Sequence, residues 1–421
     1  MKKDTSYIKV ASYEGKIGQV KKVVLLYSGG LDTSCMLKWI QDAYGAEVIT
    51  LTLDLGQQIE DLEAIKKKAL KFGAKKAYII DAKNEFADEY LAPLIKANGA
   101  YQGNYYISTV SRPLLAKWAV KIAEKEKADA IAHGCTGKGN DQVRIEATAL
   151  TLNPKIKIIA PVREWSMGRE EEIEYAKKYG IPVPANMDFP YSVDDNMWGM
   201  TWEGGEIEDP ALIPPIEKFL TTYTLAEKAP NKSELAKLTF KNGLPISLNG
   251  KEMKLTKLIG ALNKIAGKHG VGVVHHIEDR LVGLKVRGVY ELPAAHVIIT
   301  AHKNLEKYVC TRVENELKSI LDIKWAYLVY GALWLEPVVE DINAFNDKIN
   351  EKVNGAVTVK LYKGSAEVVA MESPNALYDK HLATFMKDYS FNQNASAGFI
   401  EIYSLQMKLA NQVKNKLKLE S

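Results

Sequence analysis

Residues Lys22–Ser34, with the sequence KVVLLYSGGLDTS, decide the fold of this chain. The run Lys22–Tyr27 is continuously apolar, which is typical of a strand buried on both faces. The pair Gly29-Gly30 allows a tight turn with positive φ and lets a phosphate approach the backbone. The helical spacing of Leu31–Tyr44 then places unpaired N–H groups and a positive dipole end at the same point. This order predicts a phosphate-binding loop, and the alternative is an ordinary β–α turn with a Ser or Asp cap.

The side chains of this loop suit a nucleotide. Ser28, Thr33 and Ser34 add hydroxyl donors, while Asp32 suits an Mg²⁺ ion that bridges phosphate oxygens. The loop is neither GxGxxG nor Walker A, and the other Gly-Lys pair, at 137–138, is followed by Gly139 instead of Ser or Thr. The pattern Ser-Gly-Gly-x-Asp-Ser/Thr resembles the pyrophosphate loop of N-type ATP pyrophosphatases. Members of that superfamily cleave ATP between the α- and β-phosphates.

Short apolar runs alternate with helical patterns over the first part of the chain. This alternation predicts an α/β fold, with a parallel sheet covered by helices and with ligands at the carboxyl ends of the strands. Further strands are expected at Val48–Leu53, Ala77–Ile80, Ala130–His133 and Ile156–Pro161. Further helices are expected at Ile59–Phe72, Lys83–Lys96, Pro113–Lys125, Val143–Leu152 and Arg169–Tyr179.

The pattern changes near residue 181, where a stretch rich in Pro, Gly, Asp and Trp has no clear period. Trp198 and Trp202 are costly to leave in solvent, so we expect an ordered loop packed against the protein. Hairpin turns at Asn242-Gly243 and Asn249-Gly250, a helix at Leu255–Lys268 and a strand pair over Val357–Ala370 predict a second, α+β domain.

These patterns divide the chain into four expected parts: an N-terminal arm (1–20), a nucleotide-binding domain (21–181), a second, α+β domain (182–397) and a C-terminal helix (398–421). Within the last part, Ile402–Leu419 has apolar residues at spacings of three or four with lysines between them. This amphipathic helix packs on its own domain or on another subunit, and its terminal position favours subunit association.

Composition narrows the class of protein. The chain has 421 residues and a net charge of only +4, so we expect no nucleic-acid partner. Cys35, Cys135 and Cys310 lie far apart without metal-ligand spacing, which favours a reducing, cytoplasmic location. No apolar run approaches the ~18–20 residues that span a bilayer, and residues 1–20 do not resemble a signal peptide.

A second loop follows the strand Ala130–His133. Residues 134–146, GCTGKGNDQVRIE, place three glycines in six residues beside Thr, Lys, Asn, Asp and Arg, which predicts a binding loop. With His133, this stretch is similar to the motif of the argininosuccinate synthase family. The resemblance continues through APVREW (160–165), SVDDNMWG (192–199), GKHGVG (267–272), EDRLVGLKVRGVYELPAA (278–295) and SPNALYDKHL (373–382), nearly the whole chain after residue 21.

The resemblance implies a two-step reaction with Mg-ATP, citrulline and aspartate as substrates, in an enzyme that is typically a homotetramer. The ureido oxygen of citrulline attacks the α-phosphorus of ATP, and pyrophosphate leaves. The amine of aspartate then attacks the citrullyl adenylate, giving argininosuccinate and AMP. Adenylation is needed because a urea oxygen is a poor leaving group, so catalysis rests on aligning three ligands and neutralising phosphate charge.

The resemblance also implies the site residues. Asp32 and Ser34 are the expected catalytic residues, with Asp32 as the possible metal ligand through Mg-ATP. The expected ATP contacts are Tyr27, Ser28, Gly29, Gly30, Leu31, Asp32, Thr33, Ser34, Leu53 and Gly134. The expected aspartate contacts are Thr136, Asn140 and Asp141. The expected citrulline contacts are Tyr105, Thr109 (or Ser108), Asn140, Arg144, Ser192, Thr201, Glu278 and Tyr290.

Four of the citrulline residues also have a purely structural interpretation. Tyr105 belongs to an aromatic cluster, Ser192 could be a helix cap, and Tyr290 lies in an alternating, strand-like run. Glu278 stands beside Asp279 and Arg280 and could form surface ion pairs. For these four, the family match and not the spacing favours binding.

The sequence departs from the family pattern at several positions. Val273-Val274-His275 replaces Arg-Ile-Asp, and His275-His276 lacks a carboxylate or Cys that would complete a metal site. Asp279 replaces Asn, Val286 replaces Ser, and Thr201 replaces Ser. The segment 105–113 is one residue shorter, which leaves Ser108 and Thr109 both as candidates.

Two other functions fit parts of this pattern. Another adenylating ligase of the superfamily, such as a tRNA-thiolating enzyme, would want reactive cysteines or basic RNA-binding extensions, and neither is evident. A non-catalytic nucleotide-binding regulator of the same fold would be expected to lose some of the reactive residues. All of Asp32, Thr136, Asn140, Asp141 and Arg144 are present.

Overall fold

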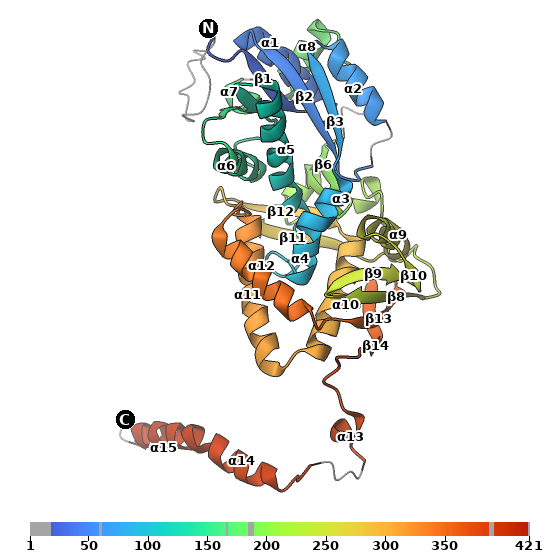
Figure 1. The fold of residues 1–421 in the computed structure, drawn as a ribbon, viewed down its shortest axis with the longest axis vertical. Coiled ribbons are helices and arrows are strands. Elements are labelled where there is room, and N and C mark those ends of the chain that lie inside the picture. The colour runs from blue at the N-terminus through green and yellow to red at the C-terminus, as the bar shows by residue number, and fades with distance from the viewer. Residues whose placement is uncertain (1–17, 59–60, 166, 184–188, 387–390, 420–421) are drawn as a thin grey trace. The chain divides into compact units, whose positions relative to one another are not determined.

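The computed structural model describes residues 18–58, 61–165, 167–183, 189–386 and 391–419 (Figure 1). Nearly all of the expected N-terminal arm therefore lies outside the described residues. The chain forms two compact units, Met1–Asn375 and Ala376–Ser421. Among the described residues, no helix is both long enough and apolar enough to cross a membrane.

The first part of the larger unit contains a five-stranded parallel sheet in the order β3-β2-β1-β4-β5. This confirms the α/β class. The strands are β1 (Lys22–Leu26), β2 (Glu47–Asp54), β3 (Lys76–Asp81), β4 (Ala130–Ala132) and β5 (Lys157–Ile159). Because β2 and β4 flank β1 on opposite sides, the point between β1 and β4 is where ligands bind in sheets of this kind.

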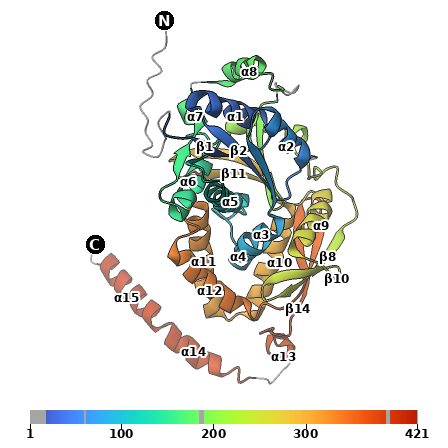
Figure 2. The ribbon, with the colours of Figure 1, turned by 45° about the horizontal axis from the view of Figure 1, so that its top comes forward.

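Helices cover both faces of this sheet (Figure 2). Val23 and Leu25 of β1 lie in a cluster with Met36 of α1, while Val24 lies in a second cluster with Leu114 of α5. All five are essentially inaccessible, which explains the continuous apolar run of the central strand. The helices are α1 (Leu31–Tyr44), α2 (Leu62–Lys71), α3 (Lys83–Glu85), α4 (Ala92–Lys96), α5 (Ser111–Glu126), α6 (Asp141–Leu152), α7 (Pro161–Glu164) and α8 (Arg169–Lys178).

Two of the expected elements differ in detail. The helix expected over Lys83–Lys96 contains a π-helical stretch, Phe86–Leu91, between α3 and α4. The strand expected over Ile156–Pro161 ends at Ile159, because Pro161 takes the first position of α7, where its missing N–H costs nothing.

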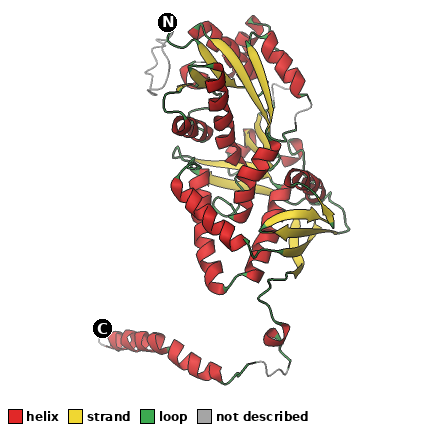
Figure 3. Cartoon of the chain, viewed as in Figure 1, coloured by secondary structure: helices red, strands yellow, loops and turns green. Residues whose placement is uncertain are grey.

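The second part of the larger unit is α+β, with two antiparallel sheets (Figure 3). One has the order β11-β12-β7-β6 and the other β10-β9-β8-β13-β14. Their strands are β6 (Tyr191–Asn196), β7 (Gly199–Gly204), β8 (Glu234–Lys241), β9 (Leu244–Leu248), β10 (Lys251–Glu252), β11 (Val273–Asp279), β12 (Lys285–Glu291), β13 (Gly355–Tyr362) and β14 (Ser365–Glu372). The helices are α9 (Leu255–Lys268), α10 (Pro293–Val309), α11 (Arg312–Tyr330) and α12 (Pro337–Asn350).

The hairpin predictions are confirmed. Asn242 and Gly243 join β8 to β9 with φ of +49° and +79°, the left-handed conformation that this turn requires. Asn249-Gly250 joins β9 to β10 in the same way. The pair over Val357–Ala370 is β13 and β14.

The stretch after residue 188, expected to be a loop, is instead the hairpin β6–β7. Its buried anchor is Trp198, whose Nε1 donates to the carbonyl of Tyr106 at 2.7 Å. Trp202 is also buried, as expected, and donates to Glu291. The strands lacked an apolar signal because several of their residues are polar and line a cavity.

The smaller unit contains α13 (Lys380–Ala383), α14 (Ala395–Tyr403) and α15 (Leu405–Leu419). The amphipathic helix expected over Ile402–Leu419 is therefore divided at Ser404, with α14 covering its first two residues.

Candidate active site

The two loops singled out in the sequence leave neighbouring strands. Loop 28–30 follows β1 and loop 134–140 follows β4, and these strands are paired in parallel. Gly134 packs against Met36 of α1 so closely that a Cβ there would lie 2.8 Å from the methionine Cε. A glycine at this position therefore lets the second loop lie directly beside the helix that follows the first loop.

The first loop has the conformation that its glycines predict. Gly29 adopts φ of +80°, and a Cβ there would lie 2.9 Å from Ile65 of α2. Lys68 of α2 donates from Nζ to the carbonyl of Gly29 at 2.6 Å. That carbonyl is thereby held by a cation, and the N-terminus of α1 begins directly after Gly30. A helix terminus of this kind attracts phosphate.

The hydroxyl groups of this loop divide into two sets. Ser34 is fully buried, and its Oγ donates to the carbonyl of Gly30 at 2.6 Å and lies 2.9 Å from the hydroxyl of Tyr27. Burial raises the pKa of Tyr27, so its hydroxyl stays protonated. Ser28 and Thr33 are more accessible and lie 3.2 Å apart, Oγ to Oγ1. Ser34 therefore braces the turn, while the outer hydroxyls face solvent.

Two of the remaining predicted ATP residues, Leu31 and Asp32, begin α1, whereas Leu53 lies near the end of β2, the strand paired with β1. Asp32, in the first turn of α1, is exposed. Leu31 and Leu53 are buried, at 5% and 2% exposure.

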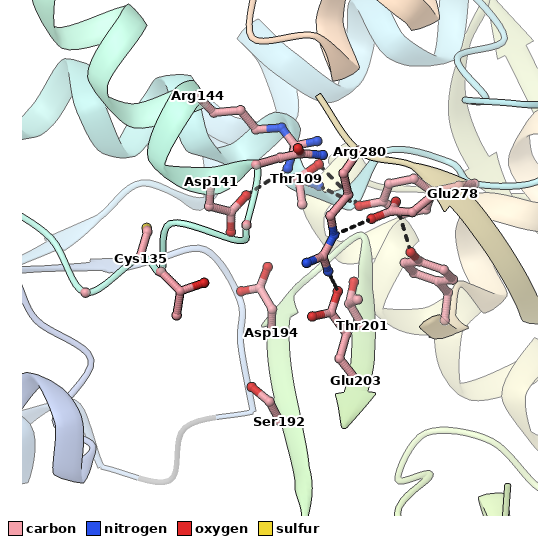
Figure 4. Close-up of a pocket in the computed structure, with 16 residues that line it drawn as sticks. Thr109, Cys135, Asp141, Arg144, Ser192, Asp194, Thr201, Glu203, Glu278 and Arg280 are labelled. Carbon is pink, nitrogen blue, oxygen red and sulfur yellow. Dashed lines mark hydrogen bonds and ion pairs between the residues drawn. The ribbon is translucent and has the colours of Figure 1, made fainter. Parts of the chain in front are cut away.

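A cavity of about 280 Å³ lies beside the second loop (Figure 4). Its walls come from α6, the segment before α5, the hairpin β6–β7 and the strands β11 and β12. The lining residues are Tyr105, Thr109, Gly134, Cys135, Thr136, Gly139, Asn140, Asp141, Arg144, Ser192, Asp194, Thr201, Glu203, Glu278, Arg280 and Tyr290.

The cavity thus brings together every predicted aspartate and citrulline contact, and Gly134 from the ATP set. The loop 27–34 and Leu53 do not line it. The departures at 273–276 and at Asp279 lie outside its walls. Asp279 instead pairs with Lys285 and bonds to Gln102.

Arginine–carboxylate contacts dominate one wall. Asp141 accepts from Arg112 Nε and from Arg144 Nη1, both at 2.8 Å, and Arg112 also pairs with Asp194. Burial alone would raise the pKa of Asp141, but the two guanidinium groups hold it well below its usual range. Asp141 is therefore a permanent anion that could face an ammonium group.

Arg144 is buried but incompletely paired. Its Nε donates to the carbonyl of Tyr330 at 3.2 Å, and its guanidinium lies 4.6 Å from the centre of that ring. Its Nη2 has no hydrogen-bond partner among the described residues. An unsatisfied buried donor on a guanidinium is costly, and it suits a carboxylate brought in by a ligand.

Asn140 is more fully occupied. Its Nδ2 donates to the hydroxyl of Tyr330 at 2.8 Å, and its Oδ1 accepts from the N–H of Leu281 at 2.8 Å. The side chain thus joins the second loop to α11 and to the turn between β11 and β12.

The opposite wall holds a carboxylate pair with one arginine between them. Arg280 donates to Glu278 at 3.3 Å and also pairs with Glu203. Glu278 accepts from the hydroxyl of Tyr290 at 3.1 Å. Burial raises the pKa of Glu203, and Arg280 opposes that shift. Glu278 is 6% exposed, so its ion pair with Arg280 is buried and does not lie at the surface.

Tyr105 belongs to the expected aromatic cluster and also reaches the cavity. Its ring centre lies 4.4 Å from that of Tyr290, and its hydroxyl lies 2.9 Å from Ser108 Oγ and 3.2 Å from Thr109 Oγ1. Ser108 is 1% exposed, whereas Thr109 lines the cavity. Ile107, in the shortened segment, has φ of +38°, a strained conformation for a β-branched residue.

Sequence reasoning missed five of the lining residues: Cys135, Gly139, Asp194, Glu203 and Arg280. The sequence signal that could have revealed Asp194 and Glu203 is an alternation of polar residues with a period of two over residues 191–204. It places Ser192 with Asp194 and Thr201 with Glu203, each pair on one face of a strand. Cys135 neighbours Asp141, and burial raises the pKa of its thiol, so it is a weak nucleophile.

Comparison with known proteins gives matches along nearly the whole chain. Residues 22–182 match the family model described as arginosuccinate synthase N-terminal HUP domain, and residues 191–410 match the arginosuccinate synthase C-terminal domain. A protein of Oceanobacillus iheyensis named argininosuccinate synthase is 51% identical over 394 residues, 93% of this chain and 94% of that protein. Its namesake from Pyrococcus furiosus is 53% identical over 92% of this chain and 94% of that protein. The one from Streptococcus mutans is 49% identical over 94% of this chain and 99% of that protein.

Proposed function

The chain belongs to the argininosuccinate synthase family, and from that premise we propose how its residues share the work of the reaction. The enzyme uses ATP to join citrulline and aspartate, through a citrullyl adenylate, and releases AMP and pyrophosphate. Two partners must therefore be aligned in turn: the α-phosphorus with the ureido oxygen, then the ureido carbon with the aspartate amine. Positioning of the substrates and neutralisation of phosphate charge supply most of the rate enhancement in such a reaction.

ATP is assigned to the loop Tyr27–Ser34, with Leu53 on the adenine side and Gly134 at the boundary with the cavity. The positive φ of Gly29 and the N-terminus of α1 support this assignment, because glycine turns and helix N-termini present backbone N–H groups that bind phosphate. Ser28 and Thr33 would supply hydroxyl donors to the outer phosphates. Ser34 stays in the catalytic set as a residue that holds the turn closed through Gly30.

Magnesium is assigned to Asp32. The carboxylate of Asp32 shares a short stretch of chain with the hydroxyls of Ser28 and Thr33, and such hard oxygen donors fit Mg²⁺ carried by ATP phosphates. The ion would neutralise charge on the leaving pyrophosphate. The chain itself would hold the nucleotide and direct the α-phosphorus toward the cavity.

Aspartate is assigned to Thr136, Asn140 and Asp141. Asp141, kept ionised by its two arginines, would hold the ammonium of aspartate, and the hydroxyl of Thr136 would bind a carboxylate. The amide of Asn140 already bonds to Tyr330 and Leu281, so we propose that it mainly holds the loop in place.

Citrulline is assigned to the deeper part of the cavity. The single observation that best supports this proposal is the unpartnered Nη2 of Arg144, because it needs an anion such as the α-carboxylate. Glu278 would hold the α-ammonium, with Tyr290 keeping the glutamate in place. The remaining contacts would come from Tyr105, Thr109, Asn140, Ser192 and Thr201.

The wider organisation is also a proposal. We propose that the chain has domains at 1–20, 21–181, 182–397 and 398–421, lies in the cytoplasm and forms a homotetramer. Large apolar side chains exposed on α11 (Val313, Leu317 and Ile320) and on the C-terminal helices support subunit association. Light scattering of the full-length chain tests the tetramer, and a monomer would contradict it.

Isotope transfer tests the reaction itself. We expect citrulline labelled with ¹⁸O in the ureido group to pass that oxygen to AMP, because this oxygen attacks the α-phosphorus and leaves with it. AMP and pyrophosphate should form together and depend on citrulline. Formation of ADP, or of AMP that carries solvent oxygen and ignores both amino acids, would contradict the function.

A further inference from the structure

Arg280 joins three separate parts of the cavity wall. Its Nε donates to Glu278 at the end of β11, its Nη2 pairs with Glu203 at the end of β7, and its Nη1 donates to the carbonyl of Lys138 at 3.2 Å. Only 11% of its side chain is exposed. Each guanidinium nitrogen of Arg280 thus binds a different segment of the chain. Arg280 is not among the residues that the family resemblance assigns to substrate binding.

The two carboxylates that it joins would otherwise repel each other. Glu278 is 8% exposed and Glu203 38% exposed as side chains, so at least one of them lies in a poorly solvated place. Like charges that share a buried site cannot both stay ionised without a cation between them. The groups that face Glu278 from the packed elements are Arg280 and His276 beside it, Glu203 on β7, Tyr290 on β12, Tyr330 on α11, and Tyr101 and Tyr105 before α5.

We propose that Arg280 is a positioning residue that sets amino-acid specificity, by holding the carboxylate of Glu278 in place so that it faces the α-ammonium of citrulline. This inference rests on the assignment of Glu278 made above. Arg280 acts through that glutamate, and through Lys138 it fixes the same wall to the loop assigned to aspartate. A ligand without an α-ammonium, such as a plain ureido acid, would lose the benefit of this arrangement.

The kinetic test compares Arg280→Ala with Arg280→Lys. The alanine variant should raise the KM for citrulline about 30-fold or more, the size of effect expected when one partner of a buried ion pair is removed. The KM for ATP should change much less, since the ATP loop does not touch this wall. The lysine variant keeps the positive charge but has a single nitrogen in place of three. Its KM for citrulline should therefore lie between those of the wild type and of Arg280→Ala.

The pH profile separates positioning from simple loss of structure. Arg280 opposes the burial that raises the pKa of Glu203, so the pKa of Glu203 should rise further in Arg280→Ala. The acid limb of kcat/KM for citrulline should then move to a higher pH. The double variant Arg280→Ala/Glu203→Gln removes the repelling charge and should move this acid limb back toward the wild-type position. No such rescue is expected if Arg280 only supports the fold.

Controls keep the inference distinct from the site assignment. Glu278→Gln should raise the KM for citrulline in the wild-type background. If it does not, the assignment of Glu278 fails. If it does, two results would still contradict the role of Arg280 without affecting that of Glu278. One is an Arg280→Ala variant with unchanged citrulline KM and acid limb, and the other is a lack of rescue by Glu203→Gln. Thermal unfolding of each variant identifies any that do not fold, and Arg280→Lys then carries the comparison.

Discussion

Arg144 donates from Nη1 to Oδ1 of Asp141 at 2.8 Å, while its Nη2 has no partner among the described residues. One guanidinium thus holds the side chain of Asp141, which is proposed to bind the substrate aspartate. The same group keeps a donor for the α-carboxylate of citrulline. With the assignments proposed for Asp141 and Arg144, binding of the two amino acids would be coupled through a single side chain.

Substitution of Arg144 should separate these two contributions. We expect Arg144→Lys to raise the KM for citrulline about 10-fold or more, since a lysine cannot serve both directions as a planar fork does. Arg144→Ala should do the same more severely. The ATP KM should change least. Steady-state kinetics with each substrate varied in turn measures this, and an unchanged citrulline KM would remove the role given to Arg144.

Asp32→Ala should abolish pyrophosphate release while the fold remains intact. The carboxylate is exposed at the first turn of α1, so its loss creates no cavity, yet it removes the expected Mg²⁺ contact. Pyrophosphate release and thermal unfolding are measured on the same sample. Asp42→Asn, near the other end of the same helix, is the matched control and should retain activity. Normal turnover by Asp32→Ala would contradict the assignment.

The shortened segment before α5 allows a direct comparison of two neighbours. Thr109→Val keeps the size of the side chain but removes its hydroxyl from the cavity, so it should raise the citrulline KM about 3- to 30-fold. Ser108→Ala removes a buried hydroxyl that bonds to Tyr105, so it should lower the free energy of unfolding by about 1–2 kcal/mol with less effect on that KM. The opposite pattern would assign the contact to Ser108.

Asp195 should make stability depend on pH. Burial raises its pKa to about 6, although the N–H of Gln58 donates to its carboxylate at 2.6 Å and opposes the shift. A carboxyl whose pKa is raised by folding binds a proton more tightly in the folded state, so stability falls as pH rises from about 4 to about 6. Asp195→Asn should be more stable than wild type above pH 6, and the two should converge near pH 4.

Urea unfolding at a series of pH values measures this difference. Asp279→Asn is the control of opposite sign, because Lys285 and Gln102 lower the pKa of Asp279. Its carboxylate contributes stability above its ordinary pKa and loses it on acidification. An Asp195→Asn curve parallel to wild type at every pH would show that Asp195 is not the group responsible.

Sequence patterns were most informative where the backbone alone decides the structure. The order strand, Gly29-Gly30, helix predicted β1 and α1 almost to the residue, because apolar period and glycine conformation are local properties. The Asn-Gly turns of β8, β9 and β10 were predicted for the same reason.

The sequence was less informative where polar residues line the cavity. The hairpin β6–β7 was missed because Ser192, Asp194 and Glu203 replace the apolar side chains that normally mark a strand. Family resemblance found Glu278, but not Arg280 two residues later, because the role of Arg280 depends on Glu203 and Lys138, which only the folded chain brings near. Contacts between such distant segments produce no recognisable pattern of residue spacing in the sequence.

The pairing of β1 with β4 has a mechanical consequence. Two hydrogen-bonded strands keep a spacing of about 4.8 Å that cannot stretch without breaking the ladder between them. The loops proposed to bind nucleotide and aspartate thus both leave one rigid pair of strands, even though some hundred residues separate them in the chain. We therefore expect any movement that aligns citrulline to come from the facing hairpins β6–β7 and β11–β12 and not from the β1–β4 pair.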